Sequence, residues 1–373
     1  MASKLFTPLK LGHGQLKHRI AMAPLTRYRA SDEHVPLPFV KEYYAQRASE
    51  PGTQLITEAT FIAPEAGGYA NAPGIWNDAQ ISAWSEVTAA VHAKQSFITL
   101  QLWALGRAAH KEELVKDLGP NAKVVSSSDV AMSDGEQPTA LTEEEIQHYI
   151  SLYAQAAKNA IKAGFDGVEI HAANGYLIDQ FTQDTANKRT DKWGGSVENR
   201  ARFGLEVAKA VVDAVGSNRT AIRLSPYSDF QDMKMEDPEP TFSYLVRELK
   251  KLNLYYLHLV TPRISGNTDV EASESIDYLL DIWDNQSPIF VAGGFTTESA
   301  KSYVEEHQDK DIVVVFGRYF VTNPDLPFRV KEGIKFTPYD RSKFYVPKDP
   351  EGYVTYEYSK EYLGANSAQK VQA

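Results

Sequence analysis

Apolar, β-branched residues gather in eight short runs along the chain, and turn residues bound each run. Runs of this length and composition are typical of buried strands. The composition does not shift between the runs, so nothing marks a domain boundary. We therefore expect eight strands in one unit, at residues 20–24, 54–59, 97–103, 167–172, 221–225, 255–260, 289–292 and 312–316.

Helical patterns lie between these runs, with apolar residues three and four positions apart. Thr142 and Glu145 form a capping box at the start of one helix, and Ser196 can cap another. Residues 36–47 and 242–252 carry two more helical patterns. Strand and helix alternate eight times, which favours a parallel sheet closed into a (β/α)8 TIM barrel over an open doubly wound sheet.

Three segments fall outside a minimal barrel. Residues 9–17 have the pattern of a small N-terminal hairpin, and residues 104–141 form a long connection of the kind that covers a binding site. Residues 365–373 are small and polar, so we expect a flexible, frayed tail. We predict one domain over residues 1–373, a barrel enlarged by extended loops over the carboxyl ends of its strands.

Composition excludes several classes of protein. The chain has no cysteine, which excludes disulfides, thiolate nucleophiles, iron–sulfur clusters and cysteine-ligated zinc, and no other metal motif is present. A formal net charge of −10 without basic runs argues against a nucleic-acid partner. No secretory signal and no stretch of roughly 18 apolar residues is present, so we expect a cytoplasmic protein without membrane contact, either a monomer or a homodimer.

Glycines and an arginine follow the last two predicted strands, where barrels commonly bind phosphate. Gly293 and Gly294 follow the seventh strand, and Gly317 and Arg318 follow the eighth. Backbone N–H groups at glycine can approach an anion, and a guanidinium can bind two of its oxygens. Alternatively, the glycines only shape tight turns.

Polar residues also alternate with apolar ones inside the strands. Arg223 should point into the barrel mouth, where it needs an anionic or electron-rich partner, and Glu169 could serve as that partner. Gln101 and Trp103 share the inward face of the third strand. A buried glutamine is either a satisfied core amide or a partner for the edge of a planar heterocycle.

The fourth strand ends in the stretch with the most reactive groups. His171 and Asn174 can both donate hydrogen bonds to one carbonyl oxygen, and the phenol of Tyr176 can deliver a proton nearby. A lone histidine at a strand end is more often structural, and the three residues together make a catalytic role about equally plausible. No dinucleotide fingerprint, zincin, serine-hydrolase or Walker motif occurs.

At these residues the sequence resembles the Old Yellow Enzyme family of flavin-dependent ene-reductases, from about Leu5 to about Tyr362. The resemblance rests on the combination of segments 22–27 (MAPLTR), 56–60 (ITEAT), 101–103 (QLW), 168–177 (VEIHAANGYL), 193–196 (WGGS), 198–200 (ENR), 224–226 (LSP) and 316–318 (FGR). Segments 38–47 and 339–345 are most similar to the fungal branch, which includes ergot-alkaloid reductases of secondary metabolism.

The resemblance implies a barrel that binds FMN noncovalently and takes reducing equivalents from NADPH. It implies flavin-ring contacts from Pro24, Leu25, Thr26, Ala59, Gln101, His171 and Arg223, and phosphate contacts from Gly293, Gly294, Gly317 and Arg318. His171 and Asn174 would bind the substrate carbonyl, and Tyr176 would protonate the α-carbon after hydride reaches the β-carbon. The pocket would be shaped by Trp103, Tyr345 and Tyr278.

Three positions separate this sequence from some relatives. Asn174 replaces a second histidine, and Gly294 stands where some members have asparagine. Thr26 replaces the cysteine of the other main subgroup, in agreement with the absence of cysteine, which also excludes the iron–sulfur dienoyl-CoA reductases.

The function that these expectations favour is NADPH-dependent reduction of the activated C=C bond of small α,β-unsaturated aldehydes and ketones. Such an enzyme is an oxidoreductase that acts on CH–CH groups or on NAD(P)H. Two alternatives remain: a flavin-free barrel lyase or isomerase acting on a phosphorylated small molecule, and a flavin-binding protein without turnover.

Overall fold

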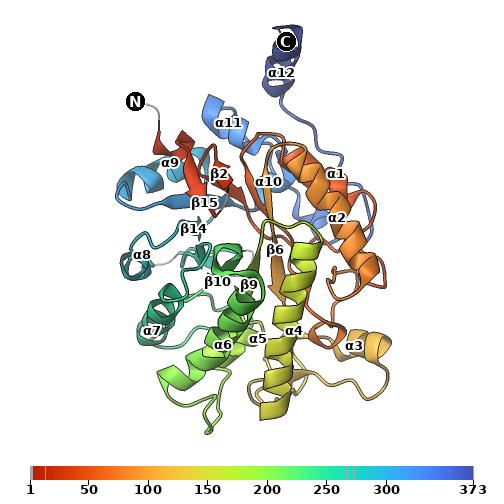
Figure 1. Cartoon of the computed structure of the whole chain (residues 1–373), viewed down its shortest axis with the longest axis vertical. Helices are drawn as coiled ribbons and strands as arrows, with labels where there is room; N and C mark the ends of the chain where they lie inside the picture. Colours follow the sequence, from red (N-terminus) through yellow and green to blue (C-terminus); the bar gives the residue numbers. More distant parts are fainter. Residues whose placement is uncertain (1–2, 13, 266–267, 272–273, 373) are drawn as a thin grey trace.

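The computed structural model describes residues 3–12, 14–265, 268–271 and 274–372. Eight parallel strands form a closed barrel because β4 pairs with both β3 and β6 (Figure 1). All eight strands predicted from the sequence are confirmed: β3 (Ile20–Met22), β4 (Gln54–Ile56), β6 (Phe97–Trp103), β9 (Gly167–Ala172), β10 (Thr220–Leu224), β11 (Leu257–Val260), β14 (Ile289–Ala292) and β15 (Ile312–Phe316).

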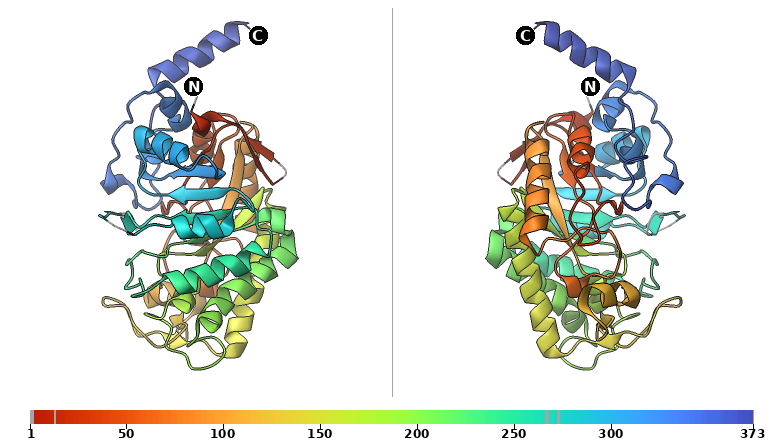
Figure 2. Two further views of the ribbon diagram at one scale, coloured as in Figure 1. Left: turned by 90° about the vertical axis from the view of Figure 1, so that its left-hand side faces the viewer. Right: turned by 90° about the vertical axis from the view of Figure 1, so that its right-hand side faces the viewer.

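Helices surround the barrel, as the views in Figure 2 show. The connections between barrel strands contain α1 (Val40–Arg47), α2 (Asp78–His92), α4 (Glu143–Lys162), α6 (Val197–Val215), α7 (Glu239–Lys250), α8 (Asp277–Trp283) and α9 (Thr297–Glu306). Thr142 and Glu145 form the predicted capping box of α4, and the Ser196 side chain caps α6. The predicted (β/α)8 TIM barrel is therefore confirmed.

Shorter elements decorate this barrel. They are β5 (Thr60–Phe61), α3 (Lys111–Leu118), β7 (Val125–Ser126), β8 (Thr139–Ala140), α5 (Leu177–Thr182), β12 (Ile264–Ser265), β13 (Thr268–Asp269), α10 (Arg318–Thr322), α11 (Leu326–Glu332), and the single-turn 3-10 helices Lys4–Phe6, Pro64–Ala66, Gly106–Ala108, Ser217–Arg219 and Arg341–Lys343. Within the described ranges, no helix has both the length and the apolar character that crossing a membrane requires.

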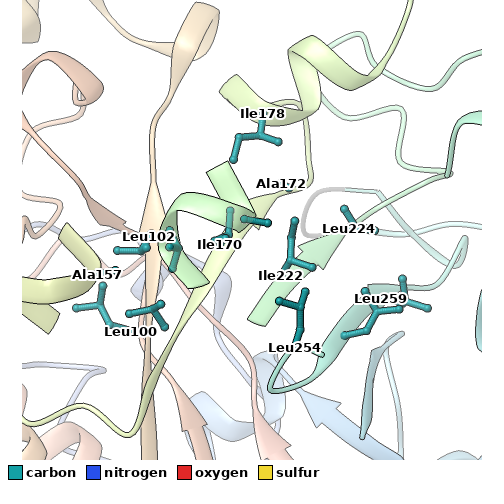
Figure 3. Close-up of a cluster of buried hydrophobic side chains, with 14 of the residues drawn as sticks. Leu100, Leu102, Ala157, Ile170, Ala172, Ile178, Ile222, Leu224, Leu254 and Leu259 are labelled. Atoms are coloured by element: carbon teal, nitrogen blue, oxygen red, sulfur yellow. The ribbon is translucent and has the colours of Figure 1, made fainter. Parts of the chain in front are cut away.

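Side chains alternate between the two faces of each barrel strand. Leu100, Ile170 and Ile222 belong to the apolar layer shared with the helices, which Figure 3 shows with Ala157 of α4 and Ile178 of α5. Their neighbours along the strands, among them Gln101, Glu169 and Arg223, therefore point into the barrel. This alternation delivers polar groups to the barrel interior while the outer face forms the core.

The predicted N-terminal hairpin is present as β1 (Leu9–Leu11) paired antiparallel with β2 (Gly14–Leu16). Its apolar residues cluster with inward-facing residues of the barrel, including Ala221 and Phe290. The hairpin therefore covers the end of the barrel at which the strands begin, and leaves the opposite end open.

Near the end of the chain, residues 360–372 form helix α12 (Lys360–Gln372), which projects from the body (Figures 1 and 2); the expected flexibility of residues 365–373 stays a prediction, and residue 373 lies outside the described residues. The Ser359 hydroxyl accepts a hydrogen bond from the Tyr362 N–H, and Ser359 is itself held by the buried carboxylate of Asp325. The Ser359 side chain therefore caps the N-terminus of α12. The small, polar composition of residues 365–373 did not predict this helix.

Candidate active site

A cleft lies where the carboxyl ends of the barrel strands meet. Each strand contributes to it either with its last residues or with the turn that follows. Every site residue predicted from the sequence except Tyr278 lines this cleft: Pro24, Leu25, Thr26, Ala59, Gln101, Trp103, His171, Asn174, Tyr176, Arg223, Gly293, Gly294, Gly317, Arg318 and Tyr345.

Tyr278 lies elsewhere in the structure. It lies on α8 and packs, half-buried, against the apolar layer between the helices and the barrel. Tyr278 is not among the residues that line the cleft, and its expected role in shaping the pocket stays a prediction.

The long connection at residues 104–141 does not cover the cleft, since none of its residues lines it. It instead supports the segment around Phe230, which lines the cleft. Arg107 donates hydrogen bonds to the backbone oxygens of Val130 and Gln231, at 3.1 and 2.9 Å, and Phe230 beside Gln231 lines the cleft.

The C-terminal segment forms another wall, through Phe344 and Tyr345. Two buried arginines that follow β3 hold it: Arg27 donates to the carbonyl oxygens of Phe344 (2.9 Å) and Gly352 (2.7 Å), and Arg29 donates to that of Asp349 (2.9 Å). Both ends of the chain therefore contribute to the same wall. Sequence patterns missed this arrangement because its partners lie more than 300 residues apart.

Glu169 is fully buried inside the barrel and accepts three hydrogen bonds. The donors are Gln101 Nε2 at 2.7 Å, the Tyr256 hydroxyl at 2.9 Å and His258 Nδ1 at 2.9 Å. Burial alone would raise the pKa of Glu169, but the contact with His258 holds it below its usual range. The hydrogen bond to Glu169 fixes the orientation of the Gln101 amide, and Gln101 lines the cleft.

Glu169 makes no direct hydrogen bond or short ion pair with Arg223 among the described residues, although the two opposite charges stabilise each other inside the barrel. The three donors from β6, β11 and the residue before β11 occupy its oxygens instead. The Nε atom of Arg223 is buried without a hydrogen-bond partner among the described residues, and Arg223 lines the cleft. The guanidinium is therefore available to an electron-rich ligand in the cleft.

A second arginine marks the other end of the cleft. Arg318 at the start of α10 has one buried nitrogen, Nη1, without a partner in the described residues, and Nη2 bonds Asp269 at 2.6 Å. Gly294 beside it has φ of +64°, and a Cβ there would lie 2.6 Å from the Asp269 carboxylate. Glycine adopts this left-handed conformation without strain, whereas a side chain here would also have to displace the Asp269 carboxylate.

The reactive groups at the end of β9 lie together. The ring centroids of His171 and Tyr176 are 4.9 Å apart, and both rings contact Trp103. The Ala173 N–H donates to His171 Nδ1 at 3.4 Å, so the neutral ring carries its proton on Nε2. Burial lowers the pKa of His171 well below its usual value and raises that of Tyr176 well above it. Both groups are therefore neutral hydrogen-bond donors at physiological pH.

Residues 4–336 match the model of the NADH:flavin oxidoreductase / NADH oxidase family. The chain belongs to this family. Its Old Yellow Enzyme members include an enzyme from Pichia sp. AKU4542, whose crystal structure superposes with a TM-score of 0.88 and 40% identity over 96% of this chain and 94% of that one. The predicted Old Yellow Enzyme resemblance is confirmed.

Two fungal relatives align with this Old Yellow Enzyme family member over nearly its whole length. A chanoclavine-I aldehyde reductase of Penicillium roqueforti is 60% identical over 368 residues, which cover 98% of this chain and 99% of the relative. A protein of Epichloe festucae var. lolii described as a probable inactive reductase is 49% identical over 380 residues, which cover 100% and 99%. The family thus establishes an FMN-type oxidoreductase fold with small-molecule substrates, and the two relatives carry different descriptions, one as an aldehyde reductase and the other as a probable inactive reductase.

Proposed function

We propose that this protein is an active ene-reductase, which uses FMN and NADPH to reduce the activated C=C bond of α,β-unsaturated aldehydes and ketones. The observation that carries the proposal is the grouping of three neutral donors, His171, Asn174 and Tyr176, in one cleft. Two of them can polarise a carbonyl oxygen while the third supplies a proton.

The residues of the cleft fit FMN. The unpartnered nitrogen of Arg223 suits the electron-rich N1/O2 edge of a flavin, and Arg318 with Gly293, Gly294 and Gly317 suits its phosphate. Pro24, Leu25, Thr26, Ala59 and Gln101 line the space between these two ends. FMN bound there would supply the hydride.

The protein's own part is to hold the carbonyl and to move a proton. His171 Nε2 and the Asn174 amide would donate to the carbonyl oxygen, which withdraws electron density from the β-carbon. The Tyr176 hydroxyl, kept protonated by burial, would then protonate the α-carbon. Trp103 and Tyr345 would contact the remainder of the substrate.

The name of the Penicillium relative supports an aldehyde as substrate. Membership of a flavin-dependent family argues against a flavin-free lyase or isomerase. The Epichloe relative favours a second candidate, a flavin-binding protein without turnover. Tyr176 at the centre of the cleft supports the active enzyme, since a binding protein needs no proton donor there.

The test uses the purified protein, its visible spectrum, an anaerobic titration and a panel of enals and enones. We expect a bound flavin spectrum, bleaching by NADPH, faster than by NADH, and oxidation of the reduced flavin by at least one enal with formation of the saturated aldehyde. A flavin that NADPH bleaches but no enal or enone reoxidises would support the second candidate. A colourless protein that does not bind added FMN would overturn both.

A further inference from the structure

The segment between His171 and Tyr176 makes an unusual turn. Asn174 and Gly175 follow β9 with φ of +55° and +77°, so two consecutive residues are left-handed. This conformation costs free energy at asparagine and persists only where surrounding contacts maintain it. Because the turn sets the direction of both Asn174 and Tyr176, whatever maintains it also sets the geometry of the site.

Buried side chains of α5 hold both backbone groups of Gly175. Its N–H donates to Asp179 Oδ2 at 2.9 Å, and its carbonyl oxygen accepts from Gln180 Nε2 at 2.8 Å. Asp179 and Gln180 are both 0% exposed. A buried carboxylate bound to a backbone N–H forms a strong, charge-assisted hydrogen bond.

The other oxygen of Asp179 also faces a donor. Gln183 Nε2 donates to Asp179 Oδ1 at 2.9 Å. Gln183 cannot rotate its amide to offer an oxygen there, because its Oε1 already accepts from the backbone N–H groups of Lys234 (2.9 Å) and Met235 (3.1 Å). Asp179 therefore faces two donors, neither of which can become an acceptor.

An ionised carboxylate satisfies this arrangement because it has two acceptor oxygens. An amide of the same shape has only one acceptor oxygen, so its NH2 group would face another donor, either the Gly175 N–H or Gln183 Nε2. Burial raises the pKa of Asp179 to about 7 against the opposing effect of these hydrogen bonds, so the ionised double acceptor prevails above about pH 7 and is buried there at a cost to the protein. A free-energy cost of this kind at the Asn174–Gly175 turn is typical of contacts that are retained for function.

We infer that Asp179 is the positioning residue of the active site, which as a double acceptor locks the Asn174–Gly175 turn and so aims the carbonyl-binding and proton-donating side chains. The inference rests on the proposed function for the roles of Asn174 and Tyr176. The same contacts join the turn, through Gln183, to the segment at residues 227–240 that brings Phe230 to the cleft.

Exchanging donors and acceptors provides the test. In Asp179→Asn, the new NH2 group must face another donor, either the Gly175 N–H or Gln183 Nε2. The double variant Asp179→Asn with Gln183→Glu removes this clash, because the new amide can accept from the Gly175 N–H and donate to the new carboxylate at position 183. Its net charge equals that of the wild type. Asp184→Asn, at an exposed carboxylate on the neighbouring turn, is the matched control. Each FMN-loaded protein is titrated with a phenol, followed by charge-transfer absorbance, and each dithionite-reduced protein is mixed with an enal.

We expect Asp179→Asn to weaken phenol binding and to slow reoxidation by the enal about tenfold or more, with FMN content retained. The double variant should recover to within about threefold of wild type, and Asp184→Asn should match wild type. Equal impairment of the single and double variants, or none in either, would overturn the inference.

Hydrogen exchange at the Gly175 amide separates this inference from the proposed function, because it needs neither flavin nor turnover. Exchange should be faster in Asp179→Asn and restored in the double variant; unchanged exchange in the single variant would contradict the locking role. If the wild-type protein reduces no alkene while exchange behaves as expected, the proposed function fails and the locked turn stands.

Discussion

Arg318 Nη2 lies 2.6 Å from the Asp269 carboxylate, at the end of the cleft that suits a phosphate. A flavin phosphate bound here must either share Arg318 with Asp269 or displace the Asp269 carboxylate from Arg318. Asp269 is more than half exposed, so its competition is modest, on the order of 1 kcal/mol or less.

The first prediction concerns this pair. Asp269→Asn should tighten FMN binding by up to about fivefold, and Arg318→Ala should weaken it by more than tenfold, because the second variant removes the charged donor itself. Quenching of flavin fluorescence on titration of the flavin-free protein measures both. Asp277→Asn removes an equal charge away from Arg318 and should leave the affinity unchanged. Weaker FMN binding in Asp269→Asn would contradict the competition.

The second prediction concerns proton delivery. Tyr176→Phe should still be reduced by NADPH but should lose roughly 10²–10⁴ in the rate of alkene reduction, which is the usual contribution of a positioned proton donor. Stopped-flow absorbance of the flavin follows the two half-reactions separately. Tyr149→Phe, on α4 outside the barrel, serves as the control. An unchanged rate of alkene reduction in Tyr176→Phe would mean that the proton comes from another group.

The third prediction concerns the carbonyl-binding pair. A phenolate resembles the enolate that would form during reduction, so His171→Ala should weaken phenol binding about tenfold, whereas His171→Gln, which keeps a donor, should lose less. Because burial keeps His171 neutral, its ionisation should produce no step in phenol affinity between pH 6 and 8. Charge-transfer absorbance measures the affinity. A rise in phenolate affinity below pH 6.5 that is absent in His171→Gln would show that the ring ionises.

The residues that point into the barrel could be predicted, because successive side chains of a strand point to opposite faces. Ile222, Arg223 and Leu224 alternate, and this alone directs Arg223 inward. The partner of Arg223 could not be predicted in the same way. Glu169 is within reach along the sheet, but its oxygens are occupied by three donors from two separate segments, Gln101 on β6 and Tyr256 and His258 at β11, and no pattern in one segment reveals the other.

Residues on helices and long connections were harder to place. Tyr278 lies on a helix whose position depends on the preceding connection, and it proved to belong to the outer layer. Asp179 had a weak local signal, an acidic residue in the first turn of a helix beside the reactive stretch. That signal is ordinarily explained by the helix dipole, and only the structure shows that Asp179 bonds the Gly175 backbone.

The fourth prediction concerns a buried carboxyl next to Ala59. Burial raises the pKa of Glu58 to about 7 from an ordinary value near 4.5. Between these values the folded protein binds a proton that the unfolded chain has released, so the free energy of unfolding falls as the pH rises. The loss approaches about 3 kcal/mol above pH 7.

Glu58→Gln removes this titration, because the amide stays neutral. Urea unfolding of the FMN-saturated protein at pH 5 and pH 8 should therefore show a larger loss of stability in wild type than in Glu58→Gln. Glu86→Gln, at an exposed carboxylate, should behave like wild type. Parallel pH profiles for wild type and Glu58→Gln would contradict the prediction.

The anchoring of the C-terminal segment by Arg27 and Arg29 has a consequence for biosynthesis. The arginines are translated among the first thirty residues, whereas the carbonyl groups that they bind leave the ribosome only after the last barrel strand. A nascent chain can therefore close its barrel while two arginines that are buried in the finished protein still lack these partners. The wall that carries Phe344 and Tyr345 is the last part of the cleft to assemble, so a ribosome that stalls after β15 would present a barrel with an open, incomplete site.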